Sequence, residues 1–240
     1  MITALILSGG TGTRLGSDIP KQYIEVDSRP IISYCFETLA ASRYIDDIWI
    51  VADEQWQDFI REAVKPYDIY ENGKLRGFSK PGENRQLSIF NGLRDIRSRL
   101  EGMGIAEKGS ILVHDAARPM LRDALIERCV DGMKGHDGVM PVLPMKDTVY
   151  LSEDGRSVSR LLERSRIFAG QAPELFDIEK YYIANERLLP DKILYVNGST
   201  EPAVMAGMDI AMVPGDEGNY KITTPSDLER FKERIAISSI

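Results

Sequence analysis

Cysteine and histidine are scarce in this sequence, and their scarcity excludes several kinds of functional site. The 240-residue chain has two cysteines, Cys35 and Cys129, and two histidines, His114 and His136. Both cysteines lie in apolar, helix-like segments, which indicates reduced packing residues and neither a disulfide framework nor a metal site. Two histidines are too few for a histidine-rich zinc site. No Ser-His-Asp or Cys-His set is visible, and no paired carboxylates suggest glycoside hydrolysis.

Long apolar runs and an excess of positive charge are also missing. No apolar run approaches the ~20 residues that a membrane span requires, so no membrane association is expected. The N-terminus lacks a charged segment followed by a long apolar stretch, so no signal peptide is expected and we predict a cytoplasmic protein. The net charge of −7 argues against a general nucleic-acid binder, although it allows a local basic pocket.

The composition is that of a globular protein, with 43% hydrophobic and 28% charged residues. A chain of this length suits one large α/β domain or two small ones. No internal repeat, low-complexity segment or linker divides it, so we expect a single domain over residues 1–240.

Apolar segments of strand and helix type alternate along the first third of the chain. The expected strands are 4–7, 45–51 and a short one near 67–70, and the expected helices are 30–39 and 55–64. This order favours a mostly parallel sheet with crossover helices on its faces. Farther along we expect helices at 86–100, 121–133, 178–188 and from 225, and strands at 111–113, 138–142 and 210–213. The segment Q-A-P-E-L-F before residue 177 is expected to be a loop.

The pattern changes at residues 147–161. Two short alternating strands flank the turn signal S-E-D-G-R, which predicts a β-hairpin. We expect a β-arm at about 145–172 that projects from the sheet. Exposed β-arms are often covered by a partner subunit, so the arm predicts a homodimer. Arg164 flanks the arm, and it is either a residue that completes the partner's site or an edge-strand charge.

A glycine-rich loop follows the first apolar run. The segment from Leu5 to Tyr23 reads L-I-L-S-G-G-T-G-T-R-L-G-S-D-I-P-K-Q-Y and includes two cations, Arg14 and Lys21. Glycines let the backbone turn tightly and approach a ligand, and exposed amide groups suit anionic oxygens. The two cations would bind a polyphosphate. The pattern is neither G-x-G-x-x-G nor G-x-x-x-x-G-K-[ST]. It predicts a nucleoside triphosphate site, with an ordinary structural turn as the alternative.

Charged side chains follow a second buried strand in the segment H-D-A-A-R-P. Asp115 comes directly after the strand 111–113, and ligands of open α/β sheets lie at the carboxyl ends of strands. A carboxylate there suits Mg²⁺, and Arg118 suits a phosphate. Lys221 is a second candidate phosphate ligand. Asp216 is either a second metal ligand or, as we favour, a turn residue. His114 is interpreted as a packing residue and not as a base.

Several motifs, in order from Leu7 to Leu228, resemble those of one family. They are L-S-G-G-T-G-T-R-L-G with P-K-Q-Y, G-E-N-R-Q-L-S-I-F-N-G-L, V-H-D-A-A-R-P, D-T-V, Q-A-P-E-L-F and N-Y-K-I-T-T-P-S-D-L. The family is the cytidylyltransferases that include 2-C-methyl-D-erythritol 4-phosphate cytidylyltransferase and ribitol-5-phosphate cytidylyltransferase. The resemblance implies a Rossmann-like nucleotidyltransferase fold with a dimerising β-arm. It also implies the reaction of CTP with a polyol phosphate to give a CDP-polyol and pyrophosphate, with Mg²⁺ as cofactor.

The resemblance further implies roles for individual residues. The CTP cradle would be Ser8, Gly9, Gly10, Thr11, Gly12 and Thr13, and the cytosine-reading segment Pro81, Gly82, Arg85 and Ser88. Arg14 and Lys21 would stabilise charge on the α-phosphate. Asp115 would serve Mg²⁺ and the acceptor. Arg118, Thr148 and Lys221 would hold the acceptor phosphate, with Arg164 reaching in from the other subunit. The attacking group would be the acceptor's phosphate oxygen, which needs no general base at neutral pH.

Three departures from the family pattern concern the loop and the acceptor side. Ser8-Gly9-Gly10 replaces A-A-G and is closer to the ribitol type. Ala172-Pro173-Glu174 replaces T-P-Q, and Thr200-Glu201-Pro202-Ala203 replaces T-D-x-A. The expected acceptor is therefore methylerythritol phosphate, ribitol phosphate, glycerol phosphate or another polyol phosphate for isoprenoid or cell-surface polymer synthesis. Two alternatives stay open, a sugar-phosphate nucleotidyltransferase that uses another nucleoside triphosphate and a non-catalytic nucleotide-binding module.

Overall fold

The computed structural model describes residues 1–10, 19–69, 73–104 and 109–238. The glycine-rich loop is thus described at its start, through Ser8, Gly9 and Gly10. Four predicted site residues, Thr11, Gly12, Thr13 and Arg14, lie outside the described residues.

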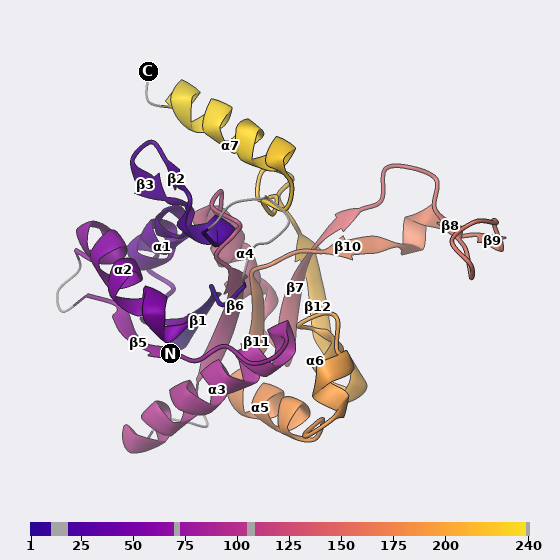
Figure 1. The fold of residues 1–240 in the computed structure, drawn as a ribbon. Coiled ribbons are helices and arrows are strands. Elements are labelled where there is room, and N and C mark those ends of the chain that lie inside the picture. Colours follow the sequence, from indigo (N-terminus) through magenta and orange to yellow (C-terminus); the bar gives the residue numbers. More distant parts are fainter. Residues whose placement is uncertain (11–18, 70–72, 105–108, 239–240) are drawn as a thin grey trace.

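An eight-stranded sheet forms the centre of the molecule (Figure 1). Its strand order is β10-β7-β11-β6-β1-β4-β5, and β12 lies beside β7. The strands are β1 (Ile2–Leu7), β4 (Asp47–Val51), β5 (Leu75–Ser79), β6 (Ser110–Asp115), β7 (Gly138–Pro144), β10 (Phe168–Gly170), β11 (Glu174–Asp177) and β12 (Ile210–Pro214). The strands β5, β4, β1 and β6 are mutually parallel, and so are β7 and β12, whereas β10 and β11 run antiparallel to their neighbours. The expected α/β fold with a mostly parallel sheet is confirmed.

Helices cover both faces of this sheet (Figure 1). They are α1 (Ile31–Ala41), α2 (Glu54–Val64), α3 (Arg85–Gly102), α4 (Asp123–Gly132), α5 (Ile178–Glu186) and α6 (Glu201–Met205). The last helix, α7 (Pro225–Ser238), lies away from the sheet and packs through Phe231 against Ile31 and Tyr34 of α1 (Figure 1). Side chains of β1 alternate between the faces, because successive residues of a strand point in opposite directions. Ala4 and Ile6 pack in the core cluster that includes residues of α1 and α4, while Leu5 packs with residues of α3 and α5.

The two cysteines are packing residues, as the sequence predicts. Cys35 on α1 and Cys129 on α4 are fully buried and both are free thiols. Burial raises the pKa of each thiol to about 12, which keeps both protonated at neutral pH.

The strand predicted near residues 67–70 is wrong. Lys65–Tyr67 form a short 3-10 helix, η3, that follows α2 directly, with Pro66 in its first turn. The neighbouring strand is β5, which begins later, at Leu75. The Asp68 carboxylate accepts hydrogen bonds from the backbone N–H groups of Lys74 and Leu75, so it links the end of the helical turn to the start of β5.

The loop predicted for Q-A-P-E-L-F is also wrong in part, because its second half is the strand β11. This strand lies in the middle of the sheet, between β6 and β7, and pairs antiparallel with both. Leu175 and Phe176 are at most 1% exposed. A segment this short has no visible period of its own, and burial in the middle of the sheet makes it a strand.

The predicted hairpin and the predicted C-terminal helix start are both present. The strands β8 (Tyr150–Leu151) and β9 (Arg160–Leu161) pair antiparallel at the end of an arm that projects from the sheet (Figure 1). At the start of α7, the Thr224 hydroxyl accepts from the Asp227 N–H and the Asp227 carboxylate accepts from the Thr224 N–H. This reciprocal pair is a capping box.

Candidate active site

Most of the predicted site residues that the structure describes come together where β1 and β6 end. The two strands are adjacent and parallel, and Leu7 on β1 lies in register with Asp115 on β6. The glycine-rich loop leaves β1 at this point, beside a cavity of about 660 Å³. A cavity of this size fits a nucleotide. Its lining includes the predicted site residues Gly9, Gly10, Lys21, Gly82, Arg85, Ser88, Asp115 and Lys221.

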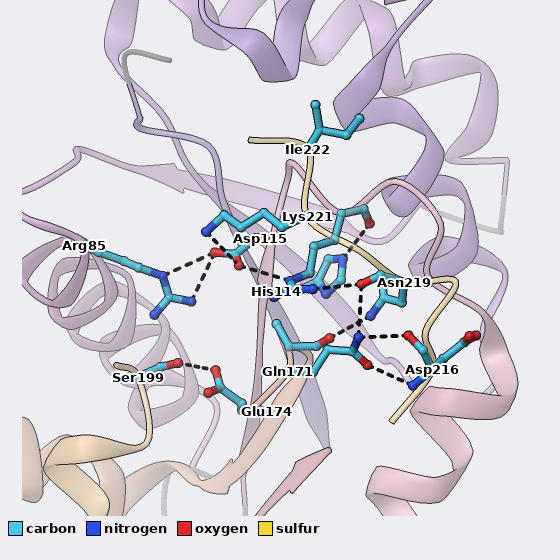
Figure 2. Close-up of polar contacts among 12 residues, drawn as sticks. Arg85, His114, Asp115, Gln171, Glu174, Ser199, Asp216, Asn219, Lys221 and Ile222 are labelled. Atoms are coloured by element: carbon cyan, nitrogen blue, oxygen red, sulfur yellow. Dashed lines mark hydrogen bonds and ion pairs between the residues drawn. The ribbon is translucent and has the colours of Figure 1, made fainter. Parts of the chain in front are cut away.

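Asp115 is the centre of a cluster of three cations (Figure 2). The guanidinium of Arg85 donates to Asp115 Oδ1 from Nε at 3.2 Å and from Nη2 at 3.1 Å. On the other oxygen, Oδ2, the ammonium of Lys221 lies at 3.1 Å and Nε of Arg118 at 3.4 Å. One buried carboxylate therefore holds three positive side chains from separate parts of the chain beside the cavity.

The charges of this cluster are shifted by burial and by one another. Burial by itself would raise the pKa of Asp115, but Arg85, Lys221 and Arg118 hold it well below its usual range. Asp115 is therefore ionised at neutral pH. The cluster carries three positive charges against one negative charge, which leaves an excess suited to the phosphates of a substrate.

The Asp115 contacts do not fit the role of a magnesium ligand. Mg²⁺ requires oxygen ligands, and both oxygens of this carboxylate already face cations. In addition, the described part of the chain contains no group of three His, Cys, Asp or Glu side chains that could hold a metal ion. Asp216, the candidate second metal ligand, has the contacts of a turn residue, because its Oδ1 accepts a hydrogen bond from the Gly218 N–H at 2.7 Å.

His114 is a packing residue, as predicted. It is fully buried, and its Nε2 lies 3.1 Å from the Arg118 carbonyl oxygen. That contact requires a proton on Nε2, since a carbonyl only accepts. Burial lowers the pKa of His114 to about 4, so the ring is neutral at pH 7. His114 thus supports the loop from Asp115 to Arg118 through its hydrogen bond to the Arg118 carbonyl.

Lys21 connects the glycine-rich side of the cavity to the C-terminal side. It begins the 3-10 helix η2 (Lys21–Tyr23), and its Nζ donates to the Ile222 carbonyl at 2.7 Å. Lys221, the neighbour of Ile222, belongs to the Asp115 cluster. The P-K-Q-Y motif and the N-Y-K-I motif therefore meet at the cavity, although they lie at opposite ends of the sequence.

Gln22 is a site residue that the sequence reasoning missed. Its side chain is 3% exposed and donates from Nε2 to the carbonyls of Ser8 at 2.7 Å and Gly10 at 2.8 Å. Tyr23 also donates to the Ser8 carbonyl, at 3.0 Å, and accepts from the Ser8 hydroxyl. The Ser8 side chain thus bonds to Tyr23 within the core. The P-K-Q-Y motif contains this glutamine directly after Lys21, so the motif is the signal for it in the sequence.

The cytosine-reading segment predicted from the resemblance packs against the glycine-rich loop. A Cβ on Gly9 would lie 2.5 Å from Cβ of Pro81, so the contact between the two loops requires glycine. The Gly82 N–H donates to the Ser88 hydroxyl at 2.9 Å, and that hydroxyl donates to the Asn84 carbonyl at 2.8 Å. The two groups predicted to contact the base, the Gly82 N–H and the Ser88 hydroxyl, thus bond to each other in this structure, and the hydroxyl also bonds to Asn84.

Two predicted acceptor residues lie outside this cluster. Thr148 is an exposed residue of the arm. Arg164 belongs to the short helix η5 (Arg164–Arg166), and its Nη1 donates to the Lys146 carbonyl at 2.6 Å. Neither residue lines the cavity of its own chain. A contribution from a second subunit therefore stays a prediction.

One departure from the family pattern, Glu174, makes a buried contact with Ser199 (Figure 2). The Glu174 carboxylate accepts from the hydroxyls of Ser199 and Thr200, the latter at 3.0 Å. Burial raises the pKa of Glu174, while the charge of Arg85 acts against that rise. Glu201 points elsewhere, because its carboxylate accepts from the Asn197 N–H at 2.8 Å. Of these two glutamates, Glu174 and not Glu201 thus lies close enough for the charge of Arg85 to act on it.

Comparison with known proteins shows the family to which the chain belongs. The model of the IspD (2-C-methyl-D-erythritol 4-phosphate cytidylyltransferase) family matches residues 2–235. A ribitol-5-phosphate cytidylyltransferase of Vibrio parahaemolyticus is 31% identical over 97% of this chain and 94% of its own length. A 2-C-methyl-D-erythritol 4-phosphate cytidylyltransferase of Rubrobacter xylanophilus is 35% identical over 94% of this chain and 90% of its own.

Solved structures show the same fold. A crystal structure described as 4-diphosphocytidyl-2C-methyl-D-erythritol synthase from Anaerococcus prevotii superposes with a TM-score of 0.82. It is 25% identical in sequence, and the match covers 98% of this chain and 96% of that one. The matching family model, the curated relatives and the fold all agree, and the chain belongs to the IspD family of cytidylyltransferases.

Proposed function

We propose that this protein transfers a cytidylyl group from CTP to a polyol phosphate, which gives a CDP-polyol and pyrophosphate. The observation that carries the proposal is the cation cluster of Asp115, Arg85, Arg118 and Lys221 beside the glycine-rich loop. Positive charge on both sides of one cavity suits two phosphorylated substrates that must approach each other.

In the proposed reaction the acceptor's phosphate oxygen attacks the α-phosphorus of CTP, and pyrophosphate leaves. A phosphate oxygen is already ionised at neutral pH, so the step needs no general base. This suits a site whose one histidine, His114, is buried and neutral. Lys21 and Arg14 would stabilise the charge that develops on the α-phosphate, while Lys221 and Arg118 would hold the acceptor phosphate. The protein's contribution is then mainly positioning and charge stabilisation.

We infer that the divalent cation implied by the family is bound mainly by the triphosphate of CTP. The described residues offer no carboxylate cluster, and Asp115 faces three cations. We assign Asp115 the role of holding those cations in place.

The homodimer and the cytoplasmic location remain parts of the proposal. The arm exposes Tyr150, Val158 and Leu161, which are 56%, 67% and 61% exposed. Large exposed apolar side chains on a projecting hairpin suit contact with a second copy. No helix in the described residues is long and apolar enough to span a membrane.

The test is a pyrophosphate-release assay with two panels. In the first panel, the rates with four nucleoside triphosphates are compared at one fixed acceptor. In the second panel, CTP is fixed and the rates with methylerythritol, ribitol, glycerol and arabinitol phosphates are compared. We expect CTP-dependent release with one acceptor clearly preferred. Release with UTP and none with CTP would favour the sugar-phosphate nucleotidyltransferase instead. Binding of CTP without turnover on any acceptor would favour the non-catalytic module.

A further inference from the structure

The backbone segment that contains Lys221 is hydrogen-bonded to the rest of the protein at both of its ends. We call residues 215–222 the Lys221 segment. At its start the Gly215 N–H donates to the Val142 carbonyl of β7 at 2.9 Å, and at its end the Ile222 N–H donates to the Ala117 carbonyl at 2.8 Å. Between these ends the segment has no regular secondary structure, so other contacts must fix its path.

Two buried carboxamides make those contacts (Figure 2). Gln171 is 4% exposed, and its Nε2 donates to the carbonyls of Asp216 at 2.8 Å and Asn219 at 3.3 Å, while its Oε1 accepts from the Asp216 N–H at 2.9 Å. Asn219 is fully buried and donates from Nδ2 to the Ala172 carbonyl at 2.7 Å. The Gln171 side chain thus binds the backbone of the Lys221 segment, and the Asn219 side chain binds the backbone next to Gln171. We call this pair the carboxamide clamp.

The clamp reaches the active site only through the backbone. Neither Gln171 nor Asn219 lines the cavity, and both side chains are neutral. The segment is nevertheless connected to the cluster at two points, since Arg118 donates to the Asn219 carbonyl at 2.8 Å and Lys221 pairs with Asp115 at 3.1 Å. A lysine has a long flexible stem, so the place of its ammonium depends on where its backbone is held.

We propose that Gln171 and Asn219 are positioning residues for acceptor binding, because they hold the Lys221 segment so that the ammonium of Lys221 stays beside Asp115. The inference rests on the proposed function, in which Lys221 binds the acceptor phosphate. A cation that is already in place loses little conformational freedom when the phosphate binds, and binding is tighter for that reason. Gln171 directly follows β10, so the clamp also joins the base of the arm to the site.

Two variants of Gln171 separate its hydrogen bonds from its volume. Gln171→Met removes all three bonds at similar size, and Gln171→Glu keeps the acceptor for the Asp216 N–H but loses both donated bonds. For both we expect the KM of the polyol phosphate to rise about tenfold or more, with the KM of CTP within about twofold. If the methionine variant does not fold, the glutamate variant and Asn219→Asp carry the test.

A double-mutant cycle tests whether the clamp acts through Lys221. In a Lys221→Met background, Gln171→Glu should change the acceptor KM by less than about twofold, because the group it positions is gone. An undiminished effect in that background would overturn the proposal. Equal rises in the KM of CTP and of the acceptor would overturn it as well.

A readout without turnover separates the clamp from the proposed function. Lysine acetylation rates of the free protein are measured by mass spectrometry, with Lys180, which pairs with Asp137, as the internal reference. We expect Lys221 to react roughly threefold faster or more in the Gln171 variants, since loss of the clamp frees its ammonium. An unchanged rate would refute the clamp, whereas absence of CTP turnover in the wild type with a raised rate would refute only the proposed function.

Asp47→Asn is the matched control for lost stability. Asp47 is 4% exposed and pairs with Arg76 at 2.6 Å and Arg99 at 3.2 Å. It begins β4, so it lies at the opposite edge of the sheet from the site. The variant should lower the urea midpoint while leaving the acceptor KM and the Lys221 labelling rate unchanged. A rise of either in this control would show that the readouts report general loosening, and would overturn the proposal.

Discussion

Arg85 and Asp115, which both line the cavity, form an ion pair with Nη2 of the guanidinium 3.1 Å from Oδ1 of the carboxylate. The family motifs assign Arg85 to the nucleotide and Asp115 to the acceptor. The ion pair joins these two halves of the site. A change at either residue is therefore expected to affect the binding of both substrates.

We expect Asp115→Asn to lower kcat/KM about 100-fold or more, and to raise the KM of both substrates. The carboxylate holds three cations, and without it their mutual repulsion spreads them apart. The partners are partly exposed, so we expect a loss of only about 1–3 kcal/mol in the free energy of unfolding. Initial rates and urea denaturation measure the two effects. A variant with wild-type kinetics would show that Asp115 does not organise the site.

Gly9→Ala should raise the KM of CTP much more than Gly10→Ala does. A Cβ on Gly9 would lie 2.5 Å from Cβ of Pro81, whereas a Cβ on Gly10 meets no atom within 4 Å. The first substitution therefore separates the glycine-rich loop from the 81–85 loop, and the second does not. CTP titrations of the two variants give the comparison. Equal effects would mean that contact between the loops does not matter for nucleotide binding.

Lys21→Ala should lower kcat about 100-fold or more with a smaller change in the KM of CTP, as expected for a charge that acts mainly in the transition state. Lys65 is exposed, with its Nζ 3.7 Å from Oε2 of Glu62, and it provides a control lysine. Lys65→Ala should leave the kinetics unchanged. A Lys21→Ala enzyme that changes only the KM of CTP would instead assign Lys21 to ground-state binding.

The stability of the protein should fall as the pH drops from about 6.5 to about 4. Burial lowers the pKa of His114 from 6.5 to about 4, so the unfolded chain takes up this proton first. His114 therefore stabilises the fold fully above pH 6.5, and this contribution, about 3 kcal/mol, is lost as the pH falls toward 4. Asp115, whose pKa is also lowered, adds a loss of the same sign below its unfolded value of 3.8.

Urea denaturation at a series of pH values measures this dependence. His114→Gln can still donate to the Arg118 carbonyl but does not titrate. We expect it to flatten the stability profile between pH 6.5 and 4, leaving the loss at lower pH. A variant with the full wild-type slope would exclude His114 as its cause.

Mixed dimers test the predicted contribution of Arg164 across subunits. We expect Lys21→Ala and Arg164→Ala each to be impaired alone. In a mixed dimer, the subunit with an intact Lys21 would receive an intact Arg164 from its partner, so mixing should restore part of the activity. Sedimentation at micromolar concentration should show a dimer. A monomer, or no recovery in mixed dimers, would contradict the predicted role of the arm.

Much of the fold followed from local sequence patterns. Strand and helix segments alternate at the right places because their apolar periods are those of a sheet with covered faces. Asp115 and the glycine-rich loop could be placed together, since parallel strands bring their carboxyl ends to one edge. The Thr224–Asp227 capping box is likewise local. The short strand β5 was expected near residues 67–70 and β11 was expected to be a loop, because contacts distant in the sequence make these segments strands.

The sequence by itself determined which residue types the site contains, because glycines, cations and one carboxylate stand at the ends of buried strands. Only the tertiary structure decided how they pair. Arg118 lies three residues after Asp115, but Arg85 and Lys221 converge on the same carboxylate, and Gln171 bonds to the turn before Lys221, although no spacing in the chain relates these residues. Such contacts arise when the sheet brings its strand ends together, and a buried polar group must then bond to whichever segment lies opposite.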